Sequence, residues 1–301
     1  MSVSKKEAKQ QVEIEVAEKE VIASGQFWRI FKRNKLAIIG ALIIIGVVLI
    51  AIFAPVIAPY DPTVQDYDNL LQPPSLDHPF GTDDLGRDLF SRVAYGARYT
   101  LLVGIGVVVI VAVVGSVLGF VAGYYGGKID SLIMRFVDIM LAIPALVLAL
   151  AIAGALGGGL WNVIIAIGAV GWTQFTRIVR AEVLKLRESE YITAARALGA
   201  SDFKIIAHHI APNMMAPVIV YITLYVPSAI LWAASLSFLG LGVQPPYPEW
   251  GALIANGRAY ISFAWWIATI PGLAIMLTVL GFNFLGDGLR DALDPRMARD
   301  L

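Results

Sequence analysis

The side chains best suited to chemistry are three histidines, and their spacing argues against a metal site or a hydrolase. His78 stands alone, whereas His208 and His209 are adjacent and would diverge on a helix, which makes them a poor pair of metal ligands. The chain has no His-Glu-x-x-His sequence, no Gly-x-Ser-x-Gly sequence and no cysteine. Metalloprotease, serine hydrolase and thiol chemistry are therefore disfavoured.

Two further stretches have the composition of ligand-binding loops without the required spacing. The acidic run 83–88 is superficially similar to a calcium loop, but it lacks the alternating oxygen ligands and the glutamate at position 12. Gly127-Lys128 cannot belong to a nucleotide-binding loop, because Ala122 stands at the first glycine position and Ile129 replaces the Ser/Thr. We expect no catalytic, cofactor-binding or metal-binding residue in this chain.

The composition indicates that much of the surface faces lipid. The chain has 301 residues, of which 58% are hydrophobic and 15% charged, and its mean hydropathy is +0.72. A soluble domain carries about a quarter charged residues. The formal net charge is zero, so no global field favours nucleic acid as a partner.

Six apolar blocks predict an all-α membrane protein with six transmembrane helices. The first block has 23 residues without a charge, about 34 Å as a helix, which is enough to cross a bilayer core. A cleaved signal peptide is disfavoured, because 35 mostly polar residues precede it. A glycine triplet at 157–159 predicts a tight hairpin between the third and fourth blocks. The blocks are Leu36–Ala58, Thr100–Tyr124, Leu132–Ala155, Leu160–Phe175, Met214–Leu241 and Trp265–Leu285.

Charge counting predicts the orientation of these spans. With a cytoplasmic N-terminus, 19 of the 23 Lys and Arg residues lie in cytoplasmic segments. Positive residues are retained on that side during insertion, so both termini are expected in the cytoplasm of a cell-membrane protein. The expected organisation is a tail and interfacial helix at 1–35, a six-helix domain at 36–286 and a tail at 287–301. An outer loop is expected at 59–99 and a cytoplasmic loop at 177–213.

Residues inside and beside the spans give further expectations. Asp138 is the one candidate charge within a span, and we expect it to pair with Arg135 near the inner edge. Glycines recur every fourth residue at 115, 119 and 123, which favours close helix packing. Pro144, Pro227 and Pro271 each interrupt a span, as hinges or as tolerated kinks. Aromatic residues at 27, 28 and 31 among basic residues predict an interfacial helix.

The most informative segment is 188–213. It predicts a helix from about Ser189 to Leu198, a stop at Gly199 in the left-handed C′ position, and a second helix from Asp202 capped by Ser201. Two such short helices can seat in the groove of a soluble partner. A loop lying on the lipid headgroups is the alternative, and the residues alone leave both open.

Sequence motifs resolve that choice through a family resemblance. The stretch AARALGASDFKIIAHHIAPN, with its Ala-Ala pair, glycine and later proline, resembles the coupling loop of permease subunits of ATP-binding-cassette importers. It is most similar to the second permease of the dipeptide/oligopeptide and nickel branch. Thr193 and Ala211 depart from the usual glutamate and leucine of that signature. Further matching stretches are FWRIFKRNKLAIIG at 27–40, HPFGTDDLGRDLFSRVAYGAR at 78–98, MRFVDIMLAIP at 134–144 and SFLGLGVQPPYPEWG at 237–251.

The resemblance implies a type I (MetI-like) importer permease fold and a set of partners. These are a homologous permease forming a heterodimer, two ATPase subunits that hydrolyse ATP, an extracytoplasmic substrate-binding protein and a peptide substrate. The residues expected to couple to an ATPase are Glu190, Ala194, Ala195, Arg196, Gly199 and Pro212. Those expected to face the binding protein are Gly81, Asp83, Asp84, Gly86, Arg87, Asp88, Pro246 and Trp250.

Three alternatives remain beside this expectation. A nickel, opine or antimicrobial-peptide importer of the same branch would share these motifs. A self-contained channel or secondary carrier would need buried ionisable residues or an inverted repeat, and neither is evident in the sequence. A membrane-bound enzyme is disfavoured by the missing nucleophile and metal motifs.

Overall fold

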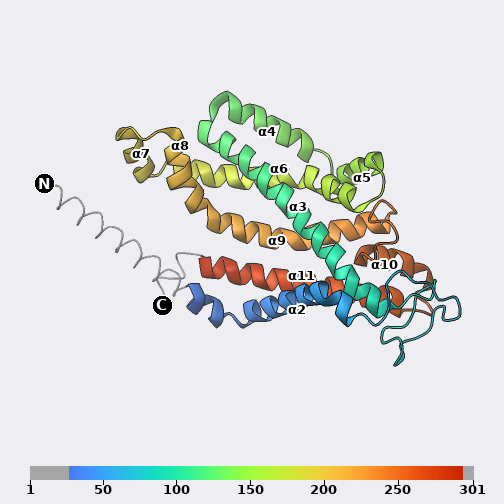
Figure 1. The fold of residues 1–301 in the computed structure, drawn as a ribbon. Helices are drawn as coiled ribbons and strands as arrows, with labels where there is room; N and C mark the ends of the chain where they lie inside the picture. Colours follow the sequence, from blue (N-terminus) through green and yellow to red (C-terminus); the bar gives the residue numbers. More distant parts are fainter. Residues whose placement is uncertain (1–26, 294–301) are drawn as a thin grey trace.

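The spans form one bundle of long helices with distinct structures at its two ends (Figure 1). A computed structural model describes residues 27–293, so the expected tail at 1–24 and the last residues of the tail at 287–301 lie outside the description. Five helices are long and apolar enough to cross a membrane, or six if one bent pair counts as a span. The helices are α2 (Lys35–Ile57), α3 (Leu89–Tyr125), α4 (Gly127–Leu141), α5 (Ala145–Leu156), α6 (Leu160–Arg187), α7 (Glu190–Ala197), α8 (Asp202–Ile205), α9 (Ala211–Phe238), α10 (Trp250–Gly257) and α11 (Trp266–Leu293).

Two spans are longer than hydropathy predicts. The 37-residue α3 begins at Leu89, because the Asp88 carboxylate accepts a hydrogen bond of 2.7 Å from the Ser91 N–H and caps the helix. Residues 89–99 of the expected outer loop are therefore helical. Likewise α6 continues from the predicted end at Phe175 to Arg187. Arginines in both extensions lower the hydropathy without breaking the helix.

The third span is bent rather than continuous. The apolar block Leu132–Ala155, which Pro144 was predicted to interrupt, forms two helices: α4 ends at Leu141 and α5 begins at Ala145, with an angle of 86° between them. Pro144 has no N–H for a helical hydrogen bond and disfavours the α conformation at Ile143. This break turns α5 across the end of the bundle (Figure 1).

The predicted glycine stripe packs α3 against α6. Gly115, Gly119 and Gly123 all face α6, and a Cβ added at Gly119 would lie 2.6 Å from the Cβ of Val179. A side chain there would push the helices apart, so the small residues permit close approach of the two backbones. The packing role predicted for this stripe is confirmed.

Charged residues join α4 to α6 at two levels. Asp138 pairs with Arg177 of α6 rather than with the predicted neighbour Arg135. Nearer the α4 N-terminus, Arg180 Nη2 donates a hydrogen bond of 2.6 Å to Asp130 Oδ2. Because α4 crosses α6 at this level, Asp138 pairs with Arg177 of another span and not with Arg135 one turn away on its own helix.

The N-terminal described segment contacts the end of α11. Residues 27–33 are helical, and Asn34 then caps α2 by accepting from the Ala37 N–H at 3.1 Å. The Asn34 amide also donates to Asp291 Oδ2 at 3.1 Å. The predicted helix is confirmed, while its placement in the lipid headgroups stays a prediction.

Candidate functional site

A tight reversal between two short helices projects from one end of the bundle, and we call residues 188–205 the knuckle (Figure 1). Gly199 follows α7 with φ of +81°. Its N–H bonds to the Arg196 carbonyl at 2.9 Å, and the Ala200 N–H bonds to the Ala195 carbonyl at 3.1 Å. This pair of bonds is a Schellman motif, which satisfies the last carbonyls of α7 and reverses the chain. The predicted stop at Gly199 is confirmed.

The knuckle is anchored from within and apolar at its tip. Ile192, Ile205 and Ile210 are fully buried, which fixes α7 and α8 against the bundle. Leu198 and Phe203 flank the reversal with 89% and 80% of their surface exposed. Two large apolar side chains with this much exposed surface indicate that a partner covers them in an assembly. Phe203 was not among the residues predicted to couple to an ATPase.

Tyr124, near the end of α3, ties the knuckle to the spans. Its hydroxyl donates a hydrogen bond of 2.6 Å to Asp202 Oδ1 in α8. The Arg196 guanidinium of α7 lies 5.4 Å from the centroid of the Tyr124 ring. The backbone carbonyl of Tyr124 accepts a hydrogen bond of 2.8 Å from Arg187 Nη1 of α6. One residue therefore joins α3, α6, α7 and α8. Tyr124 was not among the predicted site residues, because its three partners are distant from it in the sequence.

The second helix of the knuckle continues into the next span. A π-helical turn at Ile206–Ile210 links α8 to α9, with the Ala211 N–H bonded to the Ile206 carbonyl five residues back. Pro212 has no N–H for a regular i−4 bond, which accounts for the widened turn at this point. Residues 202–238 consequently form one continuous helical segment that joins the knuckle to the span α9.

Most of the predicted coupling residues gather on the knuckle. Glu190 opens α7 and is exposed, as is Ala194, whereas Ala195 is half-buried. Arg196 turns toward Tyr124 rather than to an outer rim. Pro212 is exposed but lies beyond the π-helical turn, in the first turn of α9. Nothing in these positions by itself identifies the partner.

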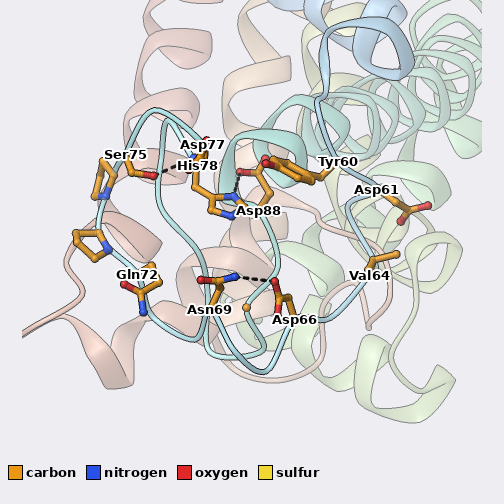
Figure 2. A pocket seen from close by; sticks show the side chains of 13 residues that line it. Tyr60, Asp61, Val64, Asp66, Asn69, Gln72, Ser75, Asp77, His78 and Asp88 are labelled. Atoms are coloured by element: carbon orange, nitrogen blue, oxygen red, sulfur yellow. Dashed lines mark hydrogen bonds and ion pairs between the residues drawn. The ribbon is translucent and has the colours of Figure 1, made fainter.

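At the opposite end, the 59–88 loop forms a polar pocket of about 560 Å³ (Figure 2). His78 Nδ1 lies 2.9 Å from Asp88 Oδ1, and the Tyr60 ring lies 4.8 Å from the His78 ring. On another wall, Asn69 Nδ2 donates a hydrogen bond of 2.8 Å to Asp66 Oδ2. This hydrogen bond lowers the pKa of Asp66, which keeps a negative charge at the pocket wall.

A buried ion cluster fastens this loop to the start of α3. Asp83 Oδ2 lies 2.7 Å from Arg87 Nε and 3.3 Å from Arg92 Nε. Arg92 also donates to the Pro62 carbonyl at 2.8 Å. All three charged side chains are buried, so the single carboxylate neutralises part of two guanidinium charges. The cluster holds distant parts of the loop in one arrangement.

Glu249 organises the start of α10, the second segment at this end of the bundle. Fully buried, it caps α10 by accepting from the Gly251 and Ala252 N–H groups at 2.9 Å each. Ser237 and Thr100 donate to the same carboxyl group at 3.1 and 3.3 Å. Burial raises the pKa of Glu249, against the effect of these donors. The sequence analysis did not identify this residue.

The residues predicted to face a binding protein fall into two groups. Asp83, Arg87, Asp88 and Trp250 are buried within the chain, so they can shape this end of the molecule but cannot themselves present a contact surface. Gly81 and Gly86 are buried as well, and their left-handed φ angles of +77° and +70° allow the turns of the loop. Asp84 is partly exposed, with Oδ2 3.4 Å from the Tyr260 hydroxyl, and Pro246 is exposed.

Two family models match the sequence. The model described as "Binding-protein-dependent transport system inner membrane component" matches residues 115–299. The model described as "N-terminal TM domain of oligopeptide transport permease C" matches residues 24–74. Together they cover the knuckle and the spans other than residues 89–114 of α3.

Curated relatives resemble the chain over most of its length. It is 53% identical over 266 residues to the dipeptide transport system permease protein of Alkalihalophilus pseudofirmus, covering 88% of each chain. It is 49% identical over 278 residues to the di/tripeptide transport system permease protein of Pseudomonas aeruginosa, covering 90% and 92%. It is 49% identical over 273 residues to the glutathione transport system permease protein of Escherichia coli O1:K1, covering 90% of each.

Solved structures support the fold. A chain of the MetNI methionine ABC transporter in an inward-facing conformation matches with a TM-score of 0.58 and 18% identity. The match covers 68% of this chain and 98% of that one. At this identity the likeness establishes the type I permease fold that the sequence predicts.

Proposed function

The chain belongs to the family of binding-protein-dependent transport system inner membrane components, and from that premise we propose that it imports short peptides. As a permease of an ABC importer it forms the membrane part of the transporter. Our proposal adds that a homologous permease completes the path, two ATPase subunits supply the energy, and an extracytoplasmic binding protein delivers the peptide. This chain would carry out no covalent step.

The attachment of the knuckle to the spans is the observation that carries the proposal. Tyr124 links the knuckle to α3 and α6, and the π-helical turn continues it into α9. A force applied to the knuckle is therefore transmitted to three spans at once. A loop resting on lipid headgroups would need no such bracing.

We assign the exposed tip of the knuckle to a groove on an ATPase subunit. Leu198 and Phe203 would be buried there, and Ala194 would allow close approach of α7. Glu190 would lie at the rim, while Arg196 would hold α7 against Tyr124. Gly199 provides the reversal on which this shape depends.

ATP drives the cycle only if it binds two conformations unequally. Closure of the ATPase pair on ATP would move two knuckles together and shift the spans from inward-open to outward-open. Hydrolysis and product release would return them. The knuckle supplies the mechanical connection, and the differential affinity for ATP supplies the free energy.

The expected orientation places the knuckle in the cytoplasm and the 59–88 loop outside. The distribution of Lys and Arg supports this assignment, because 19 of the 23 belong to segments that the sequence predicts to be cytoplasmic. The pocketed loop and the exposed Pro246 would then meet the binding protein. The buried cluster around Asp83 would act by holding that surface in shape.

Peptides are the cargo best supported by the relatives. The names of two relatives state dipeptide or di/tripeptide transport, and a third states glutathione, which is itself a modified tripeptide. Glutathione is thus a specific second candidate within the same chemical class. The three names share a small cargo with charged ends.

Reconstitution tests the proposal. The chain, its homologous permease and the two ATPases should be placed in liposomes with the binding protein outside. We expect uptake of labelled dipeptide or tripeptide that requires ATP and the binding protein, and competition by glutathione will measure its share. Uptake that proceeds without ATP would identify a carrier or channel and refute the proposal.

A further inference from the structure

Helix α4 has three different faces along its length. Val137 marks the face that packs in the bundle, fully buried. An apolar exposed stripe runs through Leu132 and Ile139. Their side chains are 74% and 58% exposed, as expected where a helix contacts lipid. A second exposed stripe is polar and runs through Ser131, Arg135 and Asp138, at spacings of four and three residues.

The polar stripe of α4 continues on α6. Gln174 and Arg177 are exposed and lie three residues apart, on one face of α6. Arg177 pairs with Asp138, which brings the two polar faces together. We call Ser131, Arg135, Asp138, Gln174 and Arg177 the polar stripe.

Both paired charges lie within segments that are long and apolar enough to cross a membrane. Asp138 follows the start of α4 by eleven residues and Arg177 precedes the end of α6 by ten, each about 15 Å along a helix. Yet 55% of the Asp138 side chain and 49% of the Arg177 side chain are exposed in the chain.

Such exposure of charged side chains within candidate spans is incompatible with lipid contact. Ionisable side chains within a membrane face water-filled cavities or other protein, because hydrocarbon does not solvate them. The neighbouring stripe of Leu132 and Ile139 supplies the lipid-facing surface of the same helix. The two exposed surfaces of α4 must therefore have different surroundings.

Resting on the proposed function, we propose that the polar stripe is the wall this subunit contributes to a water-filled path for zwitterionic peptides. The Asp138–Arg177 pair is the charged site in that wall. Asp138 binds the α-ammonium group of the cargo and Arg177 binds its α-carboxylate. When the cargo leaves, the two side chains pair with each other again, so neither charge is left alone in the membrane.

Cysteine labelling tests the path independently of the cargo. The chain has no cysteine, so each single variant introduces the one thiol of this subunit. Ser131→Cys and Gln174→Cys report on the polar stripe, and Leu132→Cys and Ile139→Cys are matched controls on the lipid stripe. We expect the first pair to react about tenfold or more faster with a charged, water-soluble thiol reagent, because the thiolate forms in water.

The labelling has two results that would overturn the inference. Equal rates on both stripes would show that the polar stripe has no special access to water. Slow reaction of Ser131→Cys and Gln174→Cys, with efficient cross-linking to the homologous permease, would assign the stripe to a subunit interface instead. A wild-type complex that imports no peptide would refute the cargo while leaving the labelling pattern to decide the path.

A second variant tests the charged site. The double substitution Asp138→Asn with Arg177→Gln removes both charges together and leaves neither unpaired. We expect uptake of a dipeptide with free ends to fall about tenfold, from the loss of charge-assisted hydrogen bonds, while ATPase stimulation by the binding protein persists. Unchanged uptake would remove this pair from the path.

Discussion

The hydroxyl of Tyr124 lies 2.6 Å from Oδ1 of Asp202, although 78 residues separate them in the sequence. This hydrogen bond fastens the second helix of the knuckle to the end of α3. The same tyrosine carries the Arg196 guanidinium on its ring. A knuckle held in this way can transmit displacement as well as bind a partner.

Tyr124→Phe should weaken coupling between ATP hydrolysis and uptake. The variant keeps the ring beneath Arg196 but loses the hydrogen bond to Asp202, at a cost of about 1 kcal/mol. We expect less peptide imported for each ATP hydrolysed, measured in proteoliposomes. Tyr125→Phe, at the exposed neighbour, is the matched control and should match the wild type. An unchanged transport-to-ATPase ratio in Tyr124→Phe would contradict a mechanical role for this bond.

Gly199→Val should uncouple uptake while the protein still inserts. Gly199 has φ of +81°, and nothing lies within 4 Å of a Cβ built there, so the effect is one of backbone conformation rather than collision. A β-branched residue at positive φ costs at least about 1–2 kcal/mol and distorts the reversal. Gly199→Asn is the control, because asparagine tolerates this conformation. Normal uptake by the valine variant would argue against the model.

Asp83→Asn should loosen the 59–88 loop. The substitution removes the carboxylate that the buried Arg87 and Arg92 guanidinium groups share and leaves Arg87 only the more distant Asp84, at a cost of about 3–5 kcal/mol. We expect faster proteolysis of the loop in the purified complex. Asp84→Asn removes a more exposed carboxylate 3.8 Å from Arg87 and should cost less than about 1 kcal/mol. Equal proteolysis rates for both variants would refute the structural role of Asp83.

Glu249 should make stability depend on pH. Burial raises its folded-state pKa above the ordinary value of 4.5, so the folded protein binds the proton more tightly than the unfolded chain does. The contribution of this group to stability is thus greatest at low pH and declines as pH rises through the folded-state pKa. Glu249→Gln does not titrate, although its amide disturbs the α10 cap. We expect the Tm of the variant relative to wild type to rise with pH, and a constant difference would contradict the raised pKa.

Local signals in the sequence predicted much of the knuckle. The reversal at Gly199 and the cap at Ser201 were both read from residues within four positions of each other, and both are confirmed. The glycine stripe of α3 was equally readable, because helical spacing places every fourth residue on nearly the same face. Such features depend on backbone conformation and helix periodicity, which neighbouring residues determine.

Side-chain contacts between distant helices could not be predicted from neighbouring residues in the sequence. Asp138 has a basic residue one turn away, yet pairs with Arg177 because α4 crosses α6 at that level. Glu249 follows a stretch of prolines and polar residues in the sequence, but it is fully buried and accepts hydrogen bonds from Thr100 and Ser237. Hydropathy also placed the second span too late, because arginines that are satisfied by tertiary contacts still count as polar.

The sequence by itself determined that the chain enters the membrane several times, which end carries most of its positive charge, and where the knuckle reverses. Hydrophobic length, charge distribution and glycine geometry are properties of short segments, so no tertiary information was needed. Only the tertiary structure decided that Tyr124 joins the knuckle to the spans and that Asp138, on the polar stripe of α4, pairs with Arg177 of α6. Those relationships arise when distant helices pack, because packing brings together side chains whose separation along the chain carries no information about their distance in space.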